Sequence, residues 1–293
     1  MNAKDASSKL SRRSFLKSSS ACVATLCVTG SGCNGPLKIG QKKRVIPVAL
    51  QLYSVRRDCQ KDLPGTIAAV AEMGYQGVEF AGYYDYTAKD VRKLLDDNGL
   101  KCCGTHTQLT TLMPDSLPKT IEFNRAIGNK YLIVPWLDPN THKSRDDWLK
   151  TADLFSELAE KVRPEGMRVG YHNHAHEFKA IDGETPWDIL FGNTAKDVIM
   201  QLDTGNAMQG GGDPIAYLKR YPGRAVTVHL KEFSATNKKA IIGEGDTDWK
   251  QVFALCETIG GTKWYIIEEE KDVYPPLEAA ELCLKNFKKL QSA

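Results

Sequence analysis

The sequence predicts an α/β fold, a single (β/α)8 TIM barrel, that occupies residues 45–293 of the 293-residue chain. Short apolar runs rich in Val, Ile and Leu alternate with helical patterns eight times over about 250 residues, the size expected of such a barrel. Polar residues follow four successive runs, where parallel strands would end at one face. A doubly wound open sheet is the second choice, because it would normally carry a glycine-rich phosphate turn after an early strand, and the sequence contains none.

Eight runs have the length and composition of strands that are buried on both faces. The predicted strands are residues 45–52, 75–80, 100–107, 131–136, 168–174, 198–203, 225–231 and 264–268. Side chains alternate along a strand, so polar residues two apart near a strand end can both point into the barrel. The pairs of this kind are His172 with His174, Gln201 with Asp203, and His229 with Lys231.

Helical patterns fill the intervals between these strands. Thr87 is placed to cap one helix, and Gly74 and Gly128 are placed to end two others. The longest pattern repeats large apolar residues from Trp148 to Leu158 at helical spacing. The predicted helices are residues 67–73, 87–98, 120–126, 145–162, 187–191, 214–220, 248–259 and 277–290.

The first 33 residues predict an export signal. Residues 11–17, Ser-Arg-Arg-Ser-Phe-Leu-Lys, resemble the bacterial twin-arginine signal, and the weakly apolar run 21–28 is too short to span a bilayer. Residues 30–33 end in Cys33 and resemble a lipoprotein cleavage site, which would make Cys33 a lipid anchor. A disordered basic tail is the alternative. We therefore expect a twin-arginine signal peptide at residues 1–33, a linker at 34–44 and a periplasmic protein.

The charge distribution argues against a nucleic-acid partner. The formal net charge is +3, but residues 1–33 carry five Lys and Arg residues against one Asp, so the remainder has a net charge of −1. A nearly neutral body without a basic stripe lacks the electrostatic footprint of a nucleic-acid binder.

Cysteine usage predicts neither a disulfide framework nor a zinc cage. Five cysteines follow Cys33, an odd number without CxxC spacing, and we expect them to be buried free thiols. They are Cys59, Cys102, Cys103, Cys256 and Cys283.

Polar residues at the ends of the last four predicted strands indicate one metal site. They are His172, Asp203, His229 and Glu268. Such groups are costly to bury alone, so their coincidence on four successive strands predicts a shared ligand. Two imidazoles and two carboxylates suit one divalent Mn, Zn, Co or Fe ion better than Ca. Each residue alone has a structural alternative, namely a hydrogen-bonded core histidine, a turn or a solvated charge run.

Other inward-facing residues are expected to line a pocket for a small carbohydrate. We expect Glu79 and His106 to bind hydroxyl groups and Trp136 to stack on a sugar face, although a structural role is equally open for each. The full set of expected substrate-binding residues is Gln51, Tyr53, Glu79, His106, Trp136, Asn173, Gln201 and Asn206.

These stretches resemble the xylose-isomerase-like barrel superfamily of sugar isomerases, epimerases and endonuclease IV enzymes. The resemblance covers residues 45–290, is strongest over 170–270, and includes the Gly-Glu-Gly turn at 243–245 before Asp248 and Trp249. It implies a divalent-metal-dependent sugar isomerase/epimerase that acts through an enediolate-type intermediate. The catalytic candidates are Glu268, Lys231, His174 and Glu177.

Two departures from the family pattern bear on the reaction. His172 stands where the family commonly has a glutamate ligand, so only Glu268 remains of a proton-transferring glutamate pair. His174, Glu177, Lys231 or a metal-bound water would then supply the second base. Asn206 stands where the DNA-repair members carry a histidine for a second zinc, so a multinuclear phosphodiesterase is not expected.

Two other functions stay open. A metal-dependent lyase or hydratase of keto-sugars or 3-keto-glycosides needs only one base. This reaction is consistent with a histidine at position 172 in place of the family's glutamate. A sugar-binding barrel without catalysis is the third choice, and the intact ligand set and Lys231 count against it. The sequence leaves open the substrate, its phosphorylation, the metal and whether the protein is a homo-oligomer.

Overall fold

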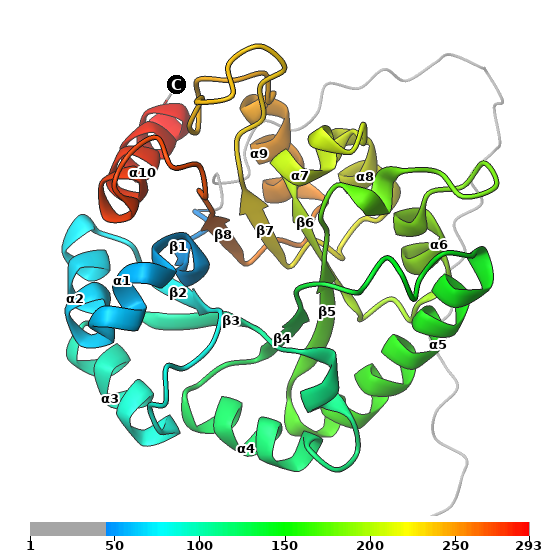
Figure 1. Ribbon diagram of the computed structural model, residues 1–293, viewed down its shortest axis with the longest axis horizontal. Helices are drawn as coiled ribbons and strands as arrows, with labels where there is room; N and C mark the ends of the chain where they lie inside the picture. Colours follow the sequence, from blue (N-terminus) through cyan, green and yellow to red (C-terminus); the bar gives the residue numbers. More distant parts are fainter. Residues whose placement is uncertain (1–44, 293) are drawn as a thin grey trace, which may run out of the picture. The chain divides into compact units, whose positions relative to one another are not determined.

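The computed structural model describes residues 45–292 and shows a closed barrel of eight parallel strands that follow one another in chain order (Figure 1). The barrel closes where Val48 of the first strand pairs with Tyr265 of the last. The predicted signal peptide, the Cys33 site and the linker lie outside the described residues. The strands are β1 (Val48–Gln51), β2 (Gly77–Phe80), β3 (Lys101–His106), β4 (Tyr131–Val134), β5 (Arg168–His172), β6 (Ile199–Asp203), β7 (Thr227–Leu230) and β8 (Trp264–Ile267).

Helices form a ring around the strands (Figure 1). All eight predicted helices are present, whereas the short α1 and α7 and four 3-10 turns were not predicted. None of the helices within residues 45–292 is long and apolar enough to cross a membrane. The elements are η1 (Leu52–Val55), α1 (Arg56–Lys61), α2 (Leu63–Met73), α3 (Ala88–Asp97), η2 (Leu109–Leu112), α4 (Leu117–Ala126), α5 (Arg145–Val162), η3 (Arg163–Glu165), η4 (His176–Phe178), α6 (Pro186–Asn193), α7 (Thr204–Gln209), α8 (Pro214–Arg220), α9 (Trp249–Thr258) and α10 (Pro276–Ser292).

The longest helix, α5, shows how the sequence specifies the outer ring. Ser144 and Asp147 form a capping box, in which each side chain accepts the backbone N–H of the other. Trp148, Phe155 and Leu158 then recur at helical spacing and are almost fully buried. The apolar face therefore packs against the strands, while the charged face remains in solvent.

The interior of the barrel changes from apolar to polar along the strands. Ile133, Ile199 and Val226 pack together inside, and a second small interior cluster contains Cys103. On β6, Ile199 is followed on the same face by the polar Gln201 and Asp203. The polar half therefore lies at the C-terminal end of the strands. The five described cysteines are free, and all but the partly buried Cys102 are buried, which agrees with the prediction.

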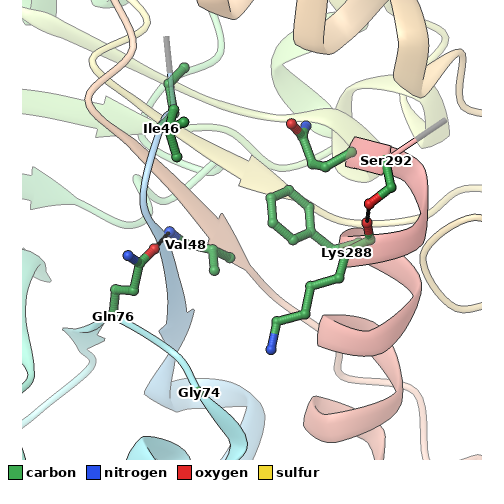
Figure 2. A pocket seen from close by; sticks show the side chains of 9 residues that line it. Ile46, Val48, Gly74, Gln76, Lys288 and Ser292 are labelled. Carbon is green, nitrogen blue, oxygen red and sulfur yellow. Dashed lines mark hydrogen bonds between the residues drawn. The ribbon is translucent and has the colours of Figure 1, made fainter. Parts of the chain in front are cut away.

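A cavity of about 540 Å³ lies at the opposite, N-terminal end of the strands (Figure 2). Gln76 accepts the N–H of Val48 at 3.1 Å, and the hydroxyl of Ser292 donates to the carbonyl of Lys288 at 2.8 Å. None of the residues proposed for metal or substrate lines this cavity. In barrels of this kind the chemistry lies at the other face, so we assign this cavity no part in the reaction.

Candidate metal centre

The four residues predicted as metal ligands lie together at the C-terminal end of the barrel. One ligand atom from each of them lies within 4.8 Å of the others. All four side chains are buried, and the most exposed, Glu268, has only 5% of its surface accessible. Asp203 and His229 are direct neighbours in the β6–β7 register. The arrangement is the one expected for polar groups at the ends of four adjacent parallel strands.

Asp203 is held with one carboxylate oxygen free. Its Oδ1 caps α7 by accepting the N–H of Asn206 at 2.7 Å. The Asn173 side chain accepts the Asp203 N–H at 2.8 Å and donates to its carbonyl at 3.1 Å. Among residues 45–292, no group is hydrogen-bonded to Asp203 Oδ2, although that atom is buried. A buried oxygen without a partner is costly, and a bound cation would satisfy it.

Hydrogen bonds determine which ring nitrogen of His172 and of His229 can bind a metal ion. Gln201 Oε1 lies 3.1 Å from His172 Nδ1, and Glu79 Oε2 lies 2.6 Å from His229 Nε2. Amide and carboxylate oxygens only accept, so both of these nitrogens must carry protons. In a neutral His172 ring the opposite nitrogen, Nε2, then keeps the lone pair that a metal requires. His229 Nδ1 lies 2.5 Å from Glu268 Oε2, so it also carries a proton here and can bind a metal only after that proton leaves.

Two overlapping sets of residues could bind a metal, and the protonation of the ring nitrogens distinguishes them. His106, His172 and His229 also bring ligand atoms within 4.8 Å of one another. However, His106 Nε2 lies 2.9 Å from Gln201 Oε1, so this nitrogen also carries a proton and cannot bind a metal. The set of His172, Asp203, His229 and Glu268, with two imidazoles and two carboxylates, fits a divalent ion once His229 Nδ1 releases its proton.

The electrostatics of the centre favour a positive charge. Burial alone would lower the pKa of His229, but the carboxylates of Glu79 and Glu268 outweigh it and raise the pKa to about 10. Burial raises the pKa of Asp203 to about 7, despite the opposing charge of Lys231. A bound divalent cation would reverse both shifts, because it favours a neutral imidazole and an ionised carboxylate.

Lys231 and His174 flank the cluster in opposite protonation states. Lys231 Nζ lies 3.5 Å from Glu268 Oε1 and also binds Glu270. Burial would lower the pKa of Lys231, but Glu268, Asp203 and Glu270 raise it, so the group is an ammonium. Burial lowers the pKa of His174 to about 4, and its ring is neutral at pH 7. No described residue is bonded to its buried Nδ1, and its ring centre lies 5.2 Å from that of His172.

Glu177 was also a catalytic candidate, but both of its carboxylate oxygens are already bonded. The Tyr171 hydroxyl donates to Oε1 at 2.5 Å, and the His174 N–H donates to Oε2 at 2.9 Å. The side chain is fully buried, and burial raises its pKa to about 7. Glu177 therefore shapes the loop that carries His174, and we do not include it among the proposed proton-transferring residues.

Three residues expected to contact the substrate lie beneath the centre instead. Gln51, Glu79 and Gln201 have no accessible surface. Gln51 donates to Glu79 Oε2 at 2.7 Å, and Gln201 donates to Glu79 Oε1 at 2.8 Å. Their polar atoms are therefore bonded to one another and do not face solvent. Asn173 likewise has no accessible surface and holds Asp203.

The remaining substrate candidates lie at the rim. Tyr53 and Trp136 are 43% and 47% exposed, which is high for large aromatic side chains. His106 lines a cavity of about 320 Å³ next to β3, and Asn206 lines another of about 380 Å³ together with Lys231. These positions leave the four side chains within reach of a ligand, and their role in substrate binding stays a prediction.

Glu232 was missed at the sequence level and organises the loop after β7. Its carboxylate accepts the Gly243 N–H at 2.7 Å, the Thr247 hydroxyl at 2.6 Å and the Trp249 indole N–H at 2.8 Å. These contacts explain the turn and Asp-Trp pair that the sequence pattern singled out. The available signal was an acidic residue directly after the His-Leu-Lys stretch.

Comparison with known proteins places this geometry in a family. The xylose isomerase-like TIM barrel family matches residues 67–290, and the chain belongs to it. An inosose dehydratase of Clostridium botulinum is 24% identical over 254 residues, which cover 73% of this chain and 85% of that protein.

Solved structures agree with the family assignment. A sugar phosphate isomerase/epimerase from Parabacteroides distasonis is 26% identical, covers 87% of this chain and 96% of its own, and superposes with a TM-score of 0.70. The IolI protein with a bound zinc atom has a TM-score of 0.66 at 14% identity, covers 84% of this chain and 98% of its own, and shares the fold. The inosose dehydratase and the sugar phosphate isomerase/epimerase are sugar-processing enzymes by name, which supports an enzyme of that kind here.

Proposed function

We propose that this protein is a metal-dependent lyase that removes water from a small cyclic or open-chain keto-sugar. The observation that carries the proposal is the pair of His174 and Lys231, a neutral imidazole and an ammonium beside the same candidate metal centre. The relatives named inosose dehydratase support this reaction class. They also make a cyclic keto-polyol the first substrate to test.

The chain's own residues are placed to divide the proton transfers. His174 Nδ1 accepts the proton from the carbon next to the substrate carbonyl, and the C–H electron pair enters the enolate. As the hydroxyl on the following carbon departs, Lys231 donates a proton to it and water leaves. Carbon skeleton, electrons and protons balance without an oxidant or reductant, and the enol product rearranges to a dicarbonyl. A site can contain both a general base and a general acid when the surroundings keep one group neutral and the other protonated.

The proposed metal ligands are His172, Asp203, His229 and Glu268. A divalent Mn, Zn, Co or Fe ion would act there as a Lewis acid that polarises the substrate carbonyl. The name of the similarly folded IolI protein includes a bound zinc atom, which is consistent with a metal-binding barrel. We propose that Tyr53, His106, Trp136 and Asn206 contact the sugar from the rim.

Epimerisation remains the second candidate, because the Parabacteroides distasonis structure carries an isomerase/epimerase name. That reaction requires a proton to be removed from one face of the carbon and returned to the other. Glu268 would be the single glutamate of this kind, and His174 would have to serve the opposite face. The sequence alone placed this function first, whereas the His174–Lys231 pair favours elimination.

Product analysis in D₂O distinguishes the reactions. The metal-loaded enzyme is incubated with inosose and with free ketoses, and products are followed by NMR and mass spectrometry. We expect a product that has lost one water and carries deuterium at the reprotonated carbon. A stereoinverted sugar of unchanged composition, formed at roughly 1 to 10³ per second, would establish the epimerase instead. Binding without turnover of any keto-sugar would contradict both.

We further propose that the protein is exported by the twin-arginine route to the periplasm, with Cys33 as a lipid anchor. Residues 11–17 and 30–33 support this. Expression in a bacterium with this pathway should place the wild type in the periplasmic or membrane fraction, and the Arg12→Lys/Arg13→Lys variant in the cytoplasm. Equal cytoplasmic retention of both, with an intact N-terminus by mass spectrometry, would refute export.

A further inference from the structure

Glu79 on β2 is a buried carboxylate surrounded by hydrogen-bond donors. Oε2 accepts from Gln51 Nε2 at 2.7 Å and from His229 Nε2 at 2.6 Å, and Oε1 accepts from Gln201 Nε2 at 2.8 Å. His106 Nε2 lies 3.2 Å from Oε2. A position that faces only donors requires a side chain that only accepts, and an ionised carboxylate is such a group.

The barrel leaves space for this carboxylate at one glycine. Gly104 is the β3 partner of Glu79 in the sheet register. A Cβ atom at Gly104 would lie 2.4 Å from Glu79 Oε1, closer than any side chain could be accommodated without displacing the carboxylate. The absence of a side chain at Gly104 on β3 therefore leaves the space that the Glu79 carboxylate occupies.

Glu79 controls the orientation of both candidate imidazole ligands. It accepts from His229 Nε2 directly, which leaves Nδ1 facing Glu268 at 2.5 Å. It also accepts from the Gln201 amide across the barrel, which turns Gln201 Oε1 toward His172 Nδ1. If the Gln201 amide were reversed, its NH₂ would face the histidines and its oxygen would face the Glu79 carboxylate.

We infer that Glu79 is the positioning residue that sets the metal affinity of this centre, by fixing the tautomers of His172 and His229 without itself binding the metal. The inference rests on the proposed metal site. Carboxylates that hold ligand imidazoles typically contribute 10- to 100-fold to metal affinity, as an order of magnitude. Glu79 is therefore distinct from a residue that contacts the substrate.

The first test replaces Glu79 by glutamine, which has the same shape but must present its NH₂ group to one of the donors. We expect Co²⁺ binding, measured by calorimetric titration, to weaken about 10- to 100-fold. The visible absorption of bound Co²⁺ should change as well, because a ligand changes orientation. Glu232→Gln is the matched control, since Glu232 is also a buried glutamate with several donors but lies outside the ligand network. Its Co²⁺ affinity should equal that of the wild type.

A second variant exchanges the two partners of the hydrogen bond between residues 79 and 201, so that the carboxylate is at position 201. In Glu79→Gln/Gln201→Glu, the amide at position 79 can keep its oxygen toward His229 and donate to the carboxylate at position 201. That carboxylate can accept from His106 and His172 in turn. We expect the double variant to recover most of the affinity, whereas Gln201→Glu alone would bring two carboxylates together at a 2.8 Å contact and weaken binding.

These measurements separate the inference from the metal site itself. A wild type that binds no Co²⁺ would refute the proposed metal centre. A wild type that binds Co²⁺ while Glu79→Gln binds equally well, or a double variant no tighter than the weaker single variant, would refute the role of Glu79 alone. Circular dichroism of the metal-free proteins checks folding. If Glu79→Gln does not fold, the double variant still tests the inference: wild-type-like affinity supports it, and loss of binding overturns it.

Discussion

Exchange of Asp203 for asparagine is expected to empty the metal centre and to lower kcat/KM by about 10³-fold, since metal polarisation is worth several kcal/mol and each 1.36 kcal/mol is tenfold. The amide can still cap α7 through its oxygen, as Oδ1 of Asp203 does at 2.7 Å. It removes the negative charge and places an NH₂ group where the free Oδ2 lies. Metal content by atomic emission and kcat/KM on the same preparation measure the effect.

Asp213→Asn is the matched control for this substitution. Asp213 is the N-cap of α8 and accepts the Ile215 N–H at 2.8 Å, but it lies outside the metal cluster. This variant should keep its metal and its activity. Full metal content and wild-type kcat/KM in Asp203→Asn would show that Asp203 is not a ligand, and the other three residues would then have to be reassigned.

Replacement of Lys231 by methionine is expected to lower kcat by about 10²- to 10⁴-fold, the usual contribution of a proton-transferring group, while the metal stays bound. The Lys231 ammonium lies 3.5 Å from Glu268 Oε1, beside the proposed ligands, and lines the cavity of about 380 Å³. Methionine keeps the unbranched shape and most of the length of the side chain but can neither donate a proton nor stabilise negative charge. Steady-state kinetics on the keto-sugar identified by product analysis provide the measurement.

Lys238 supplies the comparison for Lys231. It lines the same cavity, and its ammonium lies over the Phe233 ring, 5.6 Å from the centroid, away from the metal cluster. Lys238→Met should change KM more than kcat if the substrate reaches this cavity, and kcat should remain near that of the wild type. An unchanged kcat in Lys231→Met would remove Lys231 from the proposed reaction and leave water as the proton donor.

Local pattern was sufficient to predict the strands, the main helices and the four clustered polar residues. Buried parallel strands require continuous apolar runs, and helices on the outside require an apolar face at helical spacing, so both patterns are present in the sequence. The ends of parallel strands meet at one face, which is why the positions of His172, Asp203 and His229 in their runs predicted that they would lie together.

The short helix α7 was not predicted because its first residues favour other conformations. Thr204, Gly205 and Asn206 begin α7 and have low helix propensity, so no helix was predicted there. In the structure Asp203 caps this helix, and Asn173 fixes the Asp203 backbone from the neighbouring strand. A contact between strands therefore outweighs the weak preference of the helix residues, and no local pattern reports it.

The sequence by itself determined the eight alternating strands and helices and the polar residues at the strand ends, because these patterns depend on periodicities within single elements. Only the tertiary structure showed that Gln51, Glu79 and Gln201 are buried and hydrogen-bonded to one another. It likewise showed that Glu177 is already bonded, while Asp203 Oδ2 is free. Alternation along a strand tells which side chains point inward. How deep they lie and which groups they meet across the barrel depend on strand register and closure, which involve residues far apart in the chain.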